Sequence, residues 1–247
     1  MTAARPDQYL LSGSFNYRDV GGLHTSSGSR LRSGVLMRSA HLCRLDCTGK
    51  DRLRGVGVAT VHDLRGPDEI RYLGADVLPP GVELELSPFD SGIGRKPPHE
   101  VVYNDGWTEM LQVYRSFPTM PEAGVAITRI AESIVRGDGA VLVHCAAGKD
   151  RTGWAIATLL RAVGIAESEV LEDFLRSNDA VDALRADVEL NSGGRAVLPP
   201  EVLGVSPEYL GAGTDSMQRV YGDLEGYLAS IGLHDELRNE LKQRLLD

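Results

Sequence analysis

The sequence predicts an α/β fold in which a central, mostly parallel sheet is flanked by helices and followed by a helical C-terminal part. The first observation is a set of short apolar runs, rich in β-branched residues, that are typical of buried strands. The second is that segments with helical spacing of apolar residues separate these runs, as in parallel sheets. The third is a pair of amphipathic segments, 215–228 and 235–246, that close the chain.

The N-terminal segment, 9–40, is expected to form short strands and turns, because paired glycines and serines interrupt its apolar residues. Within it, Arg18 and Asp19 lie between two apolar residues. They could form an ion pair that holds this segment to the body of the protein, or they could support an anion-binding loop from behind. We favour the ion pair. A helix within 42–53 and a buried strand over 59–64 follow.

Asp63 and Arg65 stand at the C-terminal end of that second strand. Ligands of open α/β sheets collect at such ends, so Asp63 could face a site there. Arg65 could instead pair with Glu69, one helical turn further on. Both interpretations remain open. Pro67 favours a helix that begins at 66–69.

The middle of the chain contains a strand at 81–88 and an irregular section at about 90–107. Glycines, prolines and a basic pair occupy this section, and such a length is typical of a lid or a binding loop. Further segments of regular structure are predicted at 108–117 (helix), 121–135 (helix), 141–143 (strand), 152–163 (helix) and 169–177 (helix), with a loop at 191–194.

The stretch from His144 to Gly153 reads His-Cys-x5-Arg-Thr-Gly and lies between a predicted strand and a predicted helix. Loop amides and the first helical turn can cradle phosphate oxygens there, and the planar fork of Arg151 can hold two oxygens at once. The same positive field favours a thiolate at Cys145. The predicted phosphate contacts come from Ala146, Ala147, Gly148, Lys149, Asp150, Arg151 and Thr152.

A nucleotide-binding phosphate loop is excluded for this stretch. That motif requires Gly-x4-Gly-Lys followed by Ser or Thr. Here position 143 is valine, and Asp150 follows Gly148-Lys149. The pattern instead predicts a cysteine nucleophile below a bound phosphoryl group, with Thr152 donating a hydrogen bond to the sulfur.

These residues resemble the signature of the cysteine-dependent protein-tyrosine-phosphatase superfamily. More of the chain is similar to the bacterial tyrosine-protein phosphatases of the mycobacterial PtpB type. The resemblance implies a phosphatase-type fold, activity on phosphotyrosine with broader activity on phosphoserine, phosphothreonine and phosphoinositides, and a helical lid, for which this chain is short. The segments that carry it are 16–20, 36–39, 63–65, 148–151 and 176–179.

Enzymes of this superfamily form a phosphocysteine and protonate the leaving oxygen, usually from an aspartate on a separate upstream loop. Asp150 is the favoured acid here, because a carboxylate beside a phosphate dianion is repelled and its pKa is raised. The resemblance also points to this in-loop aspartate. Asp150 could instead point away and brace the loop. The other candidates are Asp105, Asp90 and Asp63.

Lys149 and His144 each have two interpretations. Lys149 could be a solvated side chain on the rim of the site, or it could contact a second phosphate, as on an inositol headgroup. His144 is expected to hydrogen-bond the loop backbone rather than to titrate in catalysis. Asp63 and His144 are therefore candidates for supporting roles around the loop.

The net charge of −9 argues against a nucleic-acid partner. Three cysteines form no disulfide framework and no set of metal ligands, so no cofactor and no metal are expected, and Cys43 and Cys47 are interpreted as structural thiols. No apolar stretch is long enough to span a bilayer, and the first residues lack a signal-peptide core. We expect one domain over 1–247 and a cytoplasmic location, with export by a non-classical route left open.

Three functional classes compete. The first is an active cysteine phosphatase that acts on a phosphorylated protein or a phosphoinositide. The second is a phosphate-binding module without turnover. The third is a sulfurtransferase or arsenate reductase, the latter depending on whether Cys43 or Cys47 can reach Cys145. The presence of Cys145, Arg151 and Thr152 together favours the first class.

Overall fold

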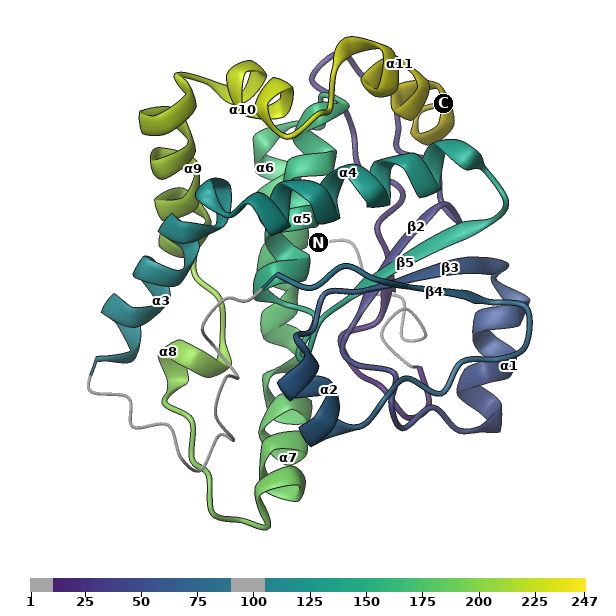
Figure 1. Ribbon diagram of the computed structural model, residues 1–247, viewed down its shortest axis with the longest axis vertical. Coiled ribbons are helices and arrows are strands. Elements are labelled where there is room, and N and C mark those ends of the chain that lie inside the picture. The colour runs from purple at the N-terminus through teal and green to yellow at the C-terminus, as the bar shows by residue number, and fades with distance from the viewer. Residues whose placement is uncertain (1–10, 90–104) are drawn as a thin grey trace.

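The computed structural model describes residues 11–89 and 105–247 (Figure 1). The first part of the chain carries most of the strands, and the second part carries most of the helices. In chain order the elements are β1 (Arg18–Asp19), β2 (Leu36–Ser39), α1 (Cys47–Gly55), β3 (Val58–Asp63), α2 (Pro67–Leu73), β4 (Glu83–Leu86), α3 (Gly106–Ser116), α4 (Pro121–Arg136), β5 (Ala140–His144), α5 (Asp150–Ala162), α6 (Glu167–Leu175), α7 (Val181–Ser192), α8 (Pro200–Leu203), α9 (Pro207–Tyr221), α10 (Leu224–Ser230) and α11 (Asp235–Leu245).

The sheet has the strand order β1-β2-β5-β3-β4. β2, β5, β3 and β4 run parallel, and only the short β1 is antiparallel, which confirms the predicted mostly parallel sheet. In the register of the three central strands, Ser39 of β2 and Asp63 of β3 both lie opposite His144 of β5. Because the carboxyl ends of these strands align, the loops that follow them meet at one edge of the sheet.

The two faces of the sheet are covered by different helices. Along β5, Val141 and Val143 pack into the larger hydrophobic core, which includes α4 and α5, whereas Leu142 packs into a smaller core that includes Leu53 of α1. Successive strand residues point to opposite faces, so a strand buried on both faces is apolar throughout. Figure 1 shows the sheet on one side of the molecule, and α3, α8 and α9 on the other.

The helical C-terminal part is confirmed, but its boundaries differ from the prediction. The expected helix over 215–228 is two helices, because Gly222 adopts a positive φ of 85° and Asp223 caps α10 through the N–H of Gly226. Val220 of α9 is 53% exposed, whereas Met217, one turn earlier, is buried. Two helices, α7 and α8, were not predicted.

Residues 90–104 of the predicted irregular section, 90–107, lie outside the described residues. Its last residues begin α3, and the Asp105 carboxylate accepts the Thr108 N–H at the helix N-terminus. Within 11–89 and 105–247, no helix is both long enough and apolar enough to cross a membrane.

Candidate active site

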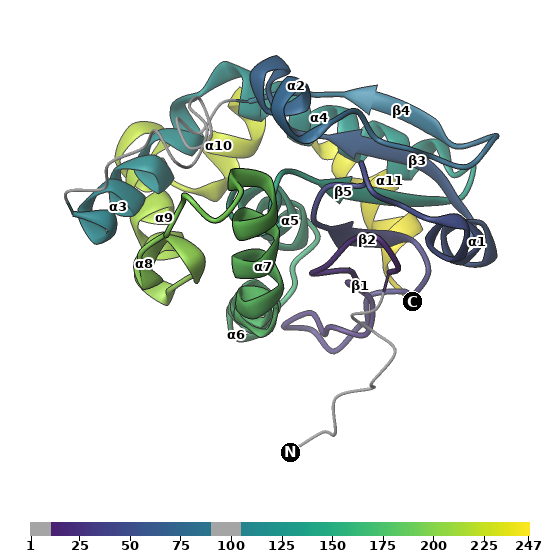
Figure 2. The ribbon, with the colours of Figure 1, turned by 90° about the horizontal axis from the view of Figure 1, so that it is seen from below.

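The segment after β5 has the predicted order of strand, tight loop and helix. β5 ends at His144, Cys145 follows at once, and α5 begins at Asp150. Figure 1 and Figure 2 both show α5 next to the sheet. The unpaired N–H groups of the first turn of α5 therefore lie at the loop, where they and the helix dipole favour a bound anion.

The outer side of the loop is held by three hydrogen-bond donors. The Asn16 side chain donates to the carbonyl oxygens of Ala147 and Gly148 at 3.0 and 2.9 Å. Arg38 Nη2 also donates to Gly148 O at 2.8 Å, and the backbone N–H of His41 donates to Ala146 O at 3.1 Å. In a trans peptide the C=O and the N–H point in opposite directions. Holding these carbonyls outward therefore turns the following amides toward the interior of the loop.

Gly148 makes this packing possible. Its φ is 67°, in the left-handed region that favours glycine, and a Cβ added there would stand 2.1 Å from the backbone oxygen of Ser39. Only a residue without a side chain allows the loop to lie so close to the end of β2. The glycine of the Gly-Lys pair is thus explained by backbone geometry.

A buried ion cluster anchors these donors. Asp173 of α6 pairs with Arg18 at 2.8 Å and with Arg38 at 2.6 Å, and all three side chains are at most 3% exposed. Burial on its own would raise the pKa of Asp173, but the two arginines outweigh it and lower the pKa to about 2. The favoured ion pair between Arg18 and Asp19 is wrong, because Arg18 pairs with Asp173. Arg18 also donates to the Asn16 side chain.

Replacing Asp173 by asparagine is expected to destabilise the protein by about 3–5 kcal/mol, because two buried arginines would share a neutral partner. Chemical denaturation at neutral pH measures this change. The contribution of Asp173 is full above its ordinary pKa of 3.8 and is lost as pH falls toward about 2, so the difference from wild type should shrink in acid. The control is Asp138→Asn, whose exposed pair with Arg136 is worth at most about 1 kcal/mol. Equal losses in the two variants would contradict the buried cluster.

Cys145 lies at the base of the loop and is 2% exposed. Burial alone would raise the pKa of its thiol, but Arg151 and the side chain and backbone N–H of Thr152 outweigh it and lower the pKa. The Thr152 hydroxyl is buried and makes no hydrogen bond by geometry in the part of the chain that the structure describes, so it is free to donate to the sulfur. The site favours a thiolate.

Arg151 is fixed by Glu69 of α2. Its Nη1 and Nη2 atoms each donate to one Glu69 oxygen at 2.5 Å, and Nη1 also donates to Leu64 O. An arginine has five N–H donors. The Nε–H and the second Nη2–H, which form the side fork of the guanidinium, have no recorded acceptor among the described residues. That fork is free to hold two phosphate oxygens.

Glu69 therefore contacts Arg151 and not Arg65, so the possible Arg65–Glu69 pair is wrong. Arg65 instead pairs with Asp63 at 2.7 Å and with Asp76 at 2.8 Å. Burial would lower the pKa of Arg151, but the Glu69 carboxylate outweighs it and raises the pKa. The guanidinium remains charged.

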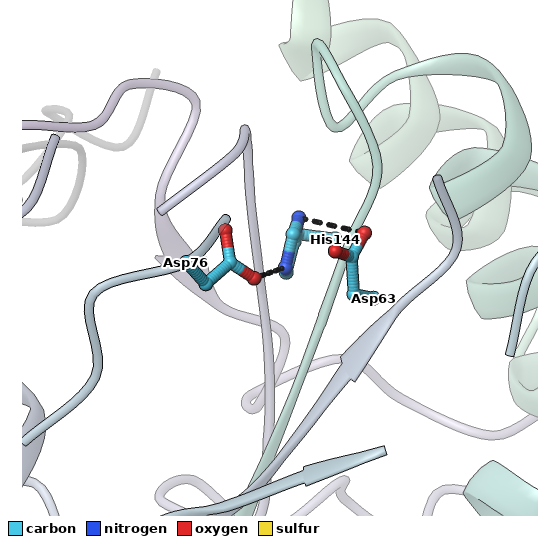
Figure 3. A group of neighbouring side chains, drawn as sticks. All are labelled: Asp63, Asp76 and His144. Carbon is cyan, nitrogen blue, oxygen red and sulfur yellow. Dashed lines mark hydrogen bonds and ion pairs between the residues drawn. The ribbon is translucent and has the colours of Figure 1, made fainter. Parts of the chain in front are cut away.

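His144 lies between Asp63 and Asp76 (Figure 3). Its Nε2 is 2.7 Å from Asp76 Oδ2, and its Nδ1 is 3.1 Å from the carbonyl oxygen of Cys145, as expected for a histidine that holds the loop backbone. Burial would lower its pKa, but the two carboxylates outweigh this and raise it. The three side chains could form a metal site by distance, with ligand atoms within 4.8 Å of one another. Arg65 already pairs with both carboxylates there.

Asp150 is buried and accepts two hydrogen bonds. Tyr114 of α3 donates its hydroxyl to Oδ1 at 2.9 Å, and Lys149 Nζ donates to the same oxygen at 2.9 Å and lies 2.8 Å from Oδ2. Lys149 is only 4% exposed and also donates to Gly204 O, so the interpretation of a solvated lysine on the rim is wrong. Burial and then the Asp150 charge raise the pKa of Tyr114 well above its usual value, which keeps the phenol protonated as a donor.

The other candidate acids are engaged elsewhere. Asp105 caps α3 through Thr108, which lowers the pKa of its carboxyl, and Asp63 accepts a bidentate contact from Arg65. Asp90 lies outside the described residues.

Comparisons with known proteins identify relatives of this chain. A family model described as "Tyrosine phosphatase family" matches residues 9–247. The chain belongs to the tyrosine phosphatase family. The triple specificity protein phosphatase PtpB of Mycobacterium tuberculosis is 35% identical over 275 residues, which cover 96% of this chain and 98% of PtpB. A tyrosine-protein phosphatase of Nostoc commune is 28% identical, covering 85% of this chain and 74% of that protein.

Among solved structures, P. aeruginosa TpbA matches with 23% identity and a TM-score of 0.34, over 68% of this chain and 88% of that chain. A second TpbA structure, in complex with pTyr, matches with 18% identity and a TM-score of 0.35, over 97% of both chains. The family match makes this chain a cysteine-dependent protein-tyrosine phosphatase.

In this phosphatase, sequence reasoning missed several supporting residues. Glu69, Asp76 and Tyr114 contact Arg151, His144 and Asp150, respectively. A weak signal existed for Arg38 alone, since an arginine within a buried strand implies a buried acidic partner. That partner, Asp173, is 135 residues away, and no local pattern connects the two.

Proposed function

We propose that the protein hydrolyses phosphotyrosine through a phosphocysteine at Cys145, with broader activity on phosphoserine and phosphothreonine. One observation carries this proposal: a buried thiol with a lowered pKa lies at the N-terminus of α5, beside an arginine whose side fork is free. A sulfur nucleophile and an oxyanion clamp are the two parts that phosphoryl transfer requires.

In the first step the Cys145 thiolate attacks phosphorus. The S–P bond forms as the bond to the tyrosine oxygen breaks in line with it. The loop amides and the free fork of Arg151 bind the three equatorial oxygens, where negative charge spreads in the transition state. Because Glu69 fixes the guanidinium before substrate arrives, little reorganisation accompanies the reaction.

The leaving oxygen receives its proton from Asp150. Tyr114 and Lys149 hold the Asp150 carboxyl group in place beside the loop. In the second step the same carboxylate accepts a proton from water, and the water oxygen attacks phosphorus to release phosphate and regenerate the thiolate.

Asp150→Asn is expected to lower kcat/KM by about 10²-fold or more for alkyl phosphates and far less for aryl phosphates with good leaving groups, because kcat/KM reports formation of the phosphocysteine and only a poor leaving group requires the proton. Steady-state kinetics on phenyl phosphates of graded leaving-group pKa measures this difference. Asp105→Asn is the matched control and should leave the series unchanged. If Asp150→Asn lost the same factor on every ester, the acid would lie at Asp105, Asp63 or Asp90.

An aromatic substrate also fits the surroundings of Asp150. The Tyr114 ring packs against Tyr209 at 5.7 Å between centroids, and Tyr209 packs against Trp107 at 5.0 Å. Trp107 is 39% exposed, so this aromatic series connects the buried acid to the surface. Tyr114 and Tyr209 are buried, so Trp107 is the ring of this series that a substrate phenyl ring can contact.

A phosphoinositide remains the alternative substrate. PtpB, the relative described above, is named a triple specificity phosphatase. The contact of Lys149 with a second phosphate would require its ammonium group to leave Asp150 and Gly204 O. This requirement makes phosphotyrosine the better supported substrate.

Phosphate release by the purified protein tests the substrate class. The panel consists of an aryl phosphate, a phosphotyrosine peptide, a phosphoserine peptide and a monophosphorylated phosphoinositide, with Cys145→Ser as the background control. We expect the phosphotyrosine peptide to give the highest kcat/KM among the three biological esters. A higher value for the lipid would replace the proposed substrate. No release from any ester, with phosphate still bound, would indicate a binding module.

A further inference from the structure

Outside the phosphate loop, Cys43, His41 and Asp187 form a chain of side-chain contacts. Cys43 Sγ lies 3.0 Å from His41 Nδ1, and His41 Nε2 lies 3.2 Å from Asp187 Oδ1. Cys43 and His41 belong to the segment between β2 and α1, whereas Asp187 comes from α7. His41 is 2% exposed, but Cys43 is only partly buried, so small molecules can reach the thiol.

This geometry is that of an activated thiol. A nucleophile contacts a base, and a third group orients the base. The His41 ring is fixed further by an edge-on contact with Phe15, at 5.9 Å between centroids. Burial would lower the pKa of His41, but its hydrogen bonds to Asp187 and Cys43 outweigh it and raise the pKa to about 9. The ring is therefore ready to hold a proton beside the sulfur.

Cys47 is a second free thiol in the same chain, with which the reactivity of Cys43 can be compared. This residue is exposed at the first position of α1, and no hydrogen bond to its thiol is recorded among the described residues. Both cysteines were expected to be structural thiols, but they differ in exposure and in hydrogen bonding. If accessibility alone set the reaction rate, Cys47 would react faster than Cys43.

We propose that Cys43 is a second reactive thiol of this protein, activated by His41 and Asp187, and that it forms mixed disulfides with low-molecular-weight disulfides. The His41 imidazolium, held by Asp187, hydrogen-bonds the Cys43 sulfur and stabilises its thiolate, and the thiol proton goes to solvent. The Cys43 sulfur attacks one sulfur of the small disulfide, the S–S bond of that molecule breaks, and a thiolate leaves. The small disulfide is the oxidant, so no further reactant is required.

The position of this thiol connects it to the phosphate loop. The backbone N–H of His41 donates to Ala146 O, one residue after Cys145. The segment that carries the proposed modification site is thus one of the three supports of the loop. Arg44, which follows Cys43, also donates to Asp187, so the segment is tied to α7 by two side chains.

The test is a competition between the two thiols in the full-length Cys145→Ser protein, which leaves only Cys43 and Cys47 to react. The protein is treated briefly with oxidised glutathione, and the remaining thiols are blocked with N-ethylmaleimide. Trypsin separates the cysteines into peptides 39–44 and 45–50, so mass spectrometry gives the rate at each site. We expect Cys43 to react at least about threefold faster than Cys47, despite its lower exposure.

Two further variants identify the source of this difference. His41→Asn and Asp187→Asn should each remove the advantage of Cys43 and leave the rate at Cys47 unchanged, with the thermal unfolding midpoint reporting that each variant is folded. The proposal is overturned if Cys47 reacts as fast as Cys43 in the starting protein. It is also overturned if both folded variants keep the advantage of Cys43.

Discussion

Cys145→Ser is expected to lower kcat by more than about 10⁴-fold on every phosphomonoester while phosphate binding persists. A serine hydroxyl is not ionised by the field that favours a thiolate at this position, so the attacking atom is lost. The loop amides and Arg151 are unchanged, and removal of the thiolate charge also removes its repulsion of the phosphate. Phosphate release measures turnover, and isothermal titration with inorganic phosphate measures binding.

Cys47→Ser is the matched control, because it removes an exposed thiol that makes none of the loop contacts described above. It should keep wild-type turnover. Residual turnover of Cys145→Ser near the wild-type rate would sink the cysteine mechanism, and loss of phosphate binding in that variant would show that the thiol shapes the loop.

Arg151→Lys is expected to lower kcat by about 10³-fold, although the charge is kept. Lysine carries its charge at a single point and cannot hold two phosphate oxygens while it also holds both oxygens of Glu69. The loss should fall on kcat more than on KM, because the side fork contacts oxygens whose charge changes in the transition state. Steady-state kinetics on an aryl phosphate separates the two parameters.

Arg161→Lys is the control on the same helix, where the arginine pairs with Glu167 near the end of α5 that lies away from the phosphate loop. It should retain nearly wild-type turnover. If Arg151→Lys were equally active, Arg151 would be a structural partner of Glu69 and not the phosphate clamp.

The parallel core of the fold was predictable because each of its elements has a local signal. The residues Val141-Leu142-Val143 are buried on both faces, and such strands are continuously apolar. Pro67 and Asp46 mark two helix starts for reasons that lie within one turn of the chain. The break between α9 and α10 was missed because the helical spacing of apolar residues continues across Gly222.

The phosphate loop was also predictable, since Cys145, Arg151 and Thr152 lie in one short stretch. Its supports were not, because their partners are remote. Glu69 and Arg151 are 82 residues apart, and Arg18 and Asp173 are 155 residues apart. Ion pairs at such separations depend on how helices pack, and no periodicity within a segment records that packing. The prediction of a lid falls largely on residues outside those described and stays a prediction.

The most direct test of the central claim is to trap the phosphoenzyme. The wild type and the Asp150→Asn variant would be mixed with an aryl phosphate that carries radiolabelled phosphate, and turnover would be stopped by a denaturing quench. We predict covalent phosphate on the peptide that contains Cys145, approaching one per protein in Asp150→Asn, where water attack is slowed. Phosphate release without any labelled Cys145, or with the label on another residue, would contradict the account.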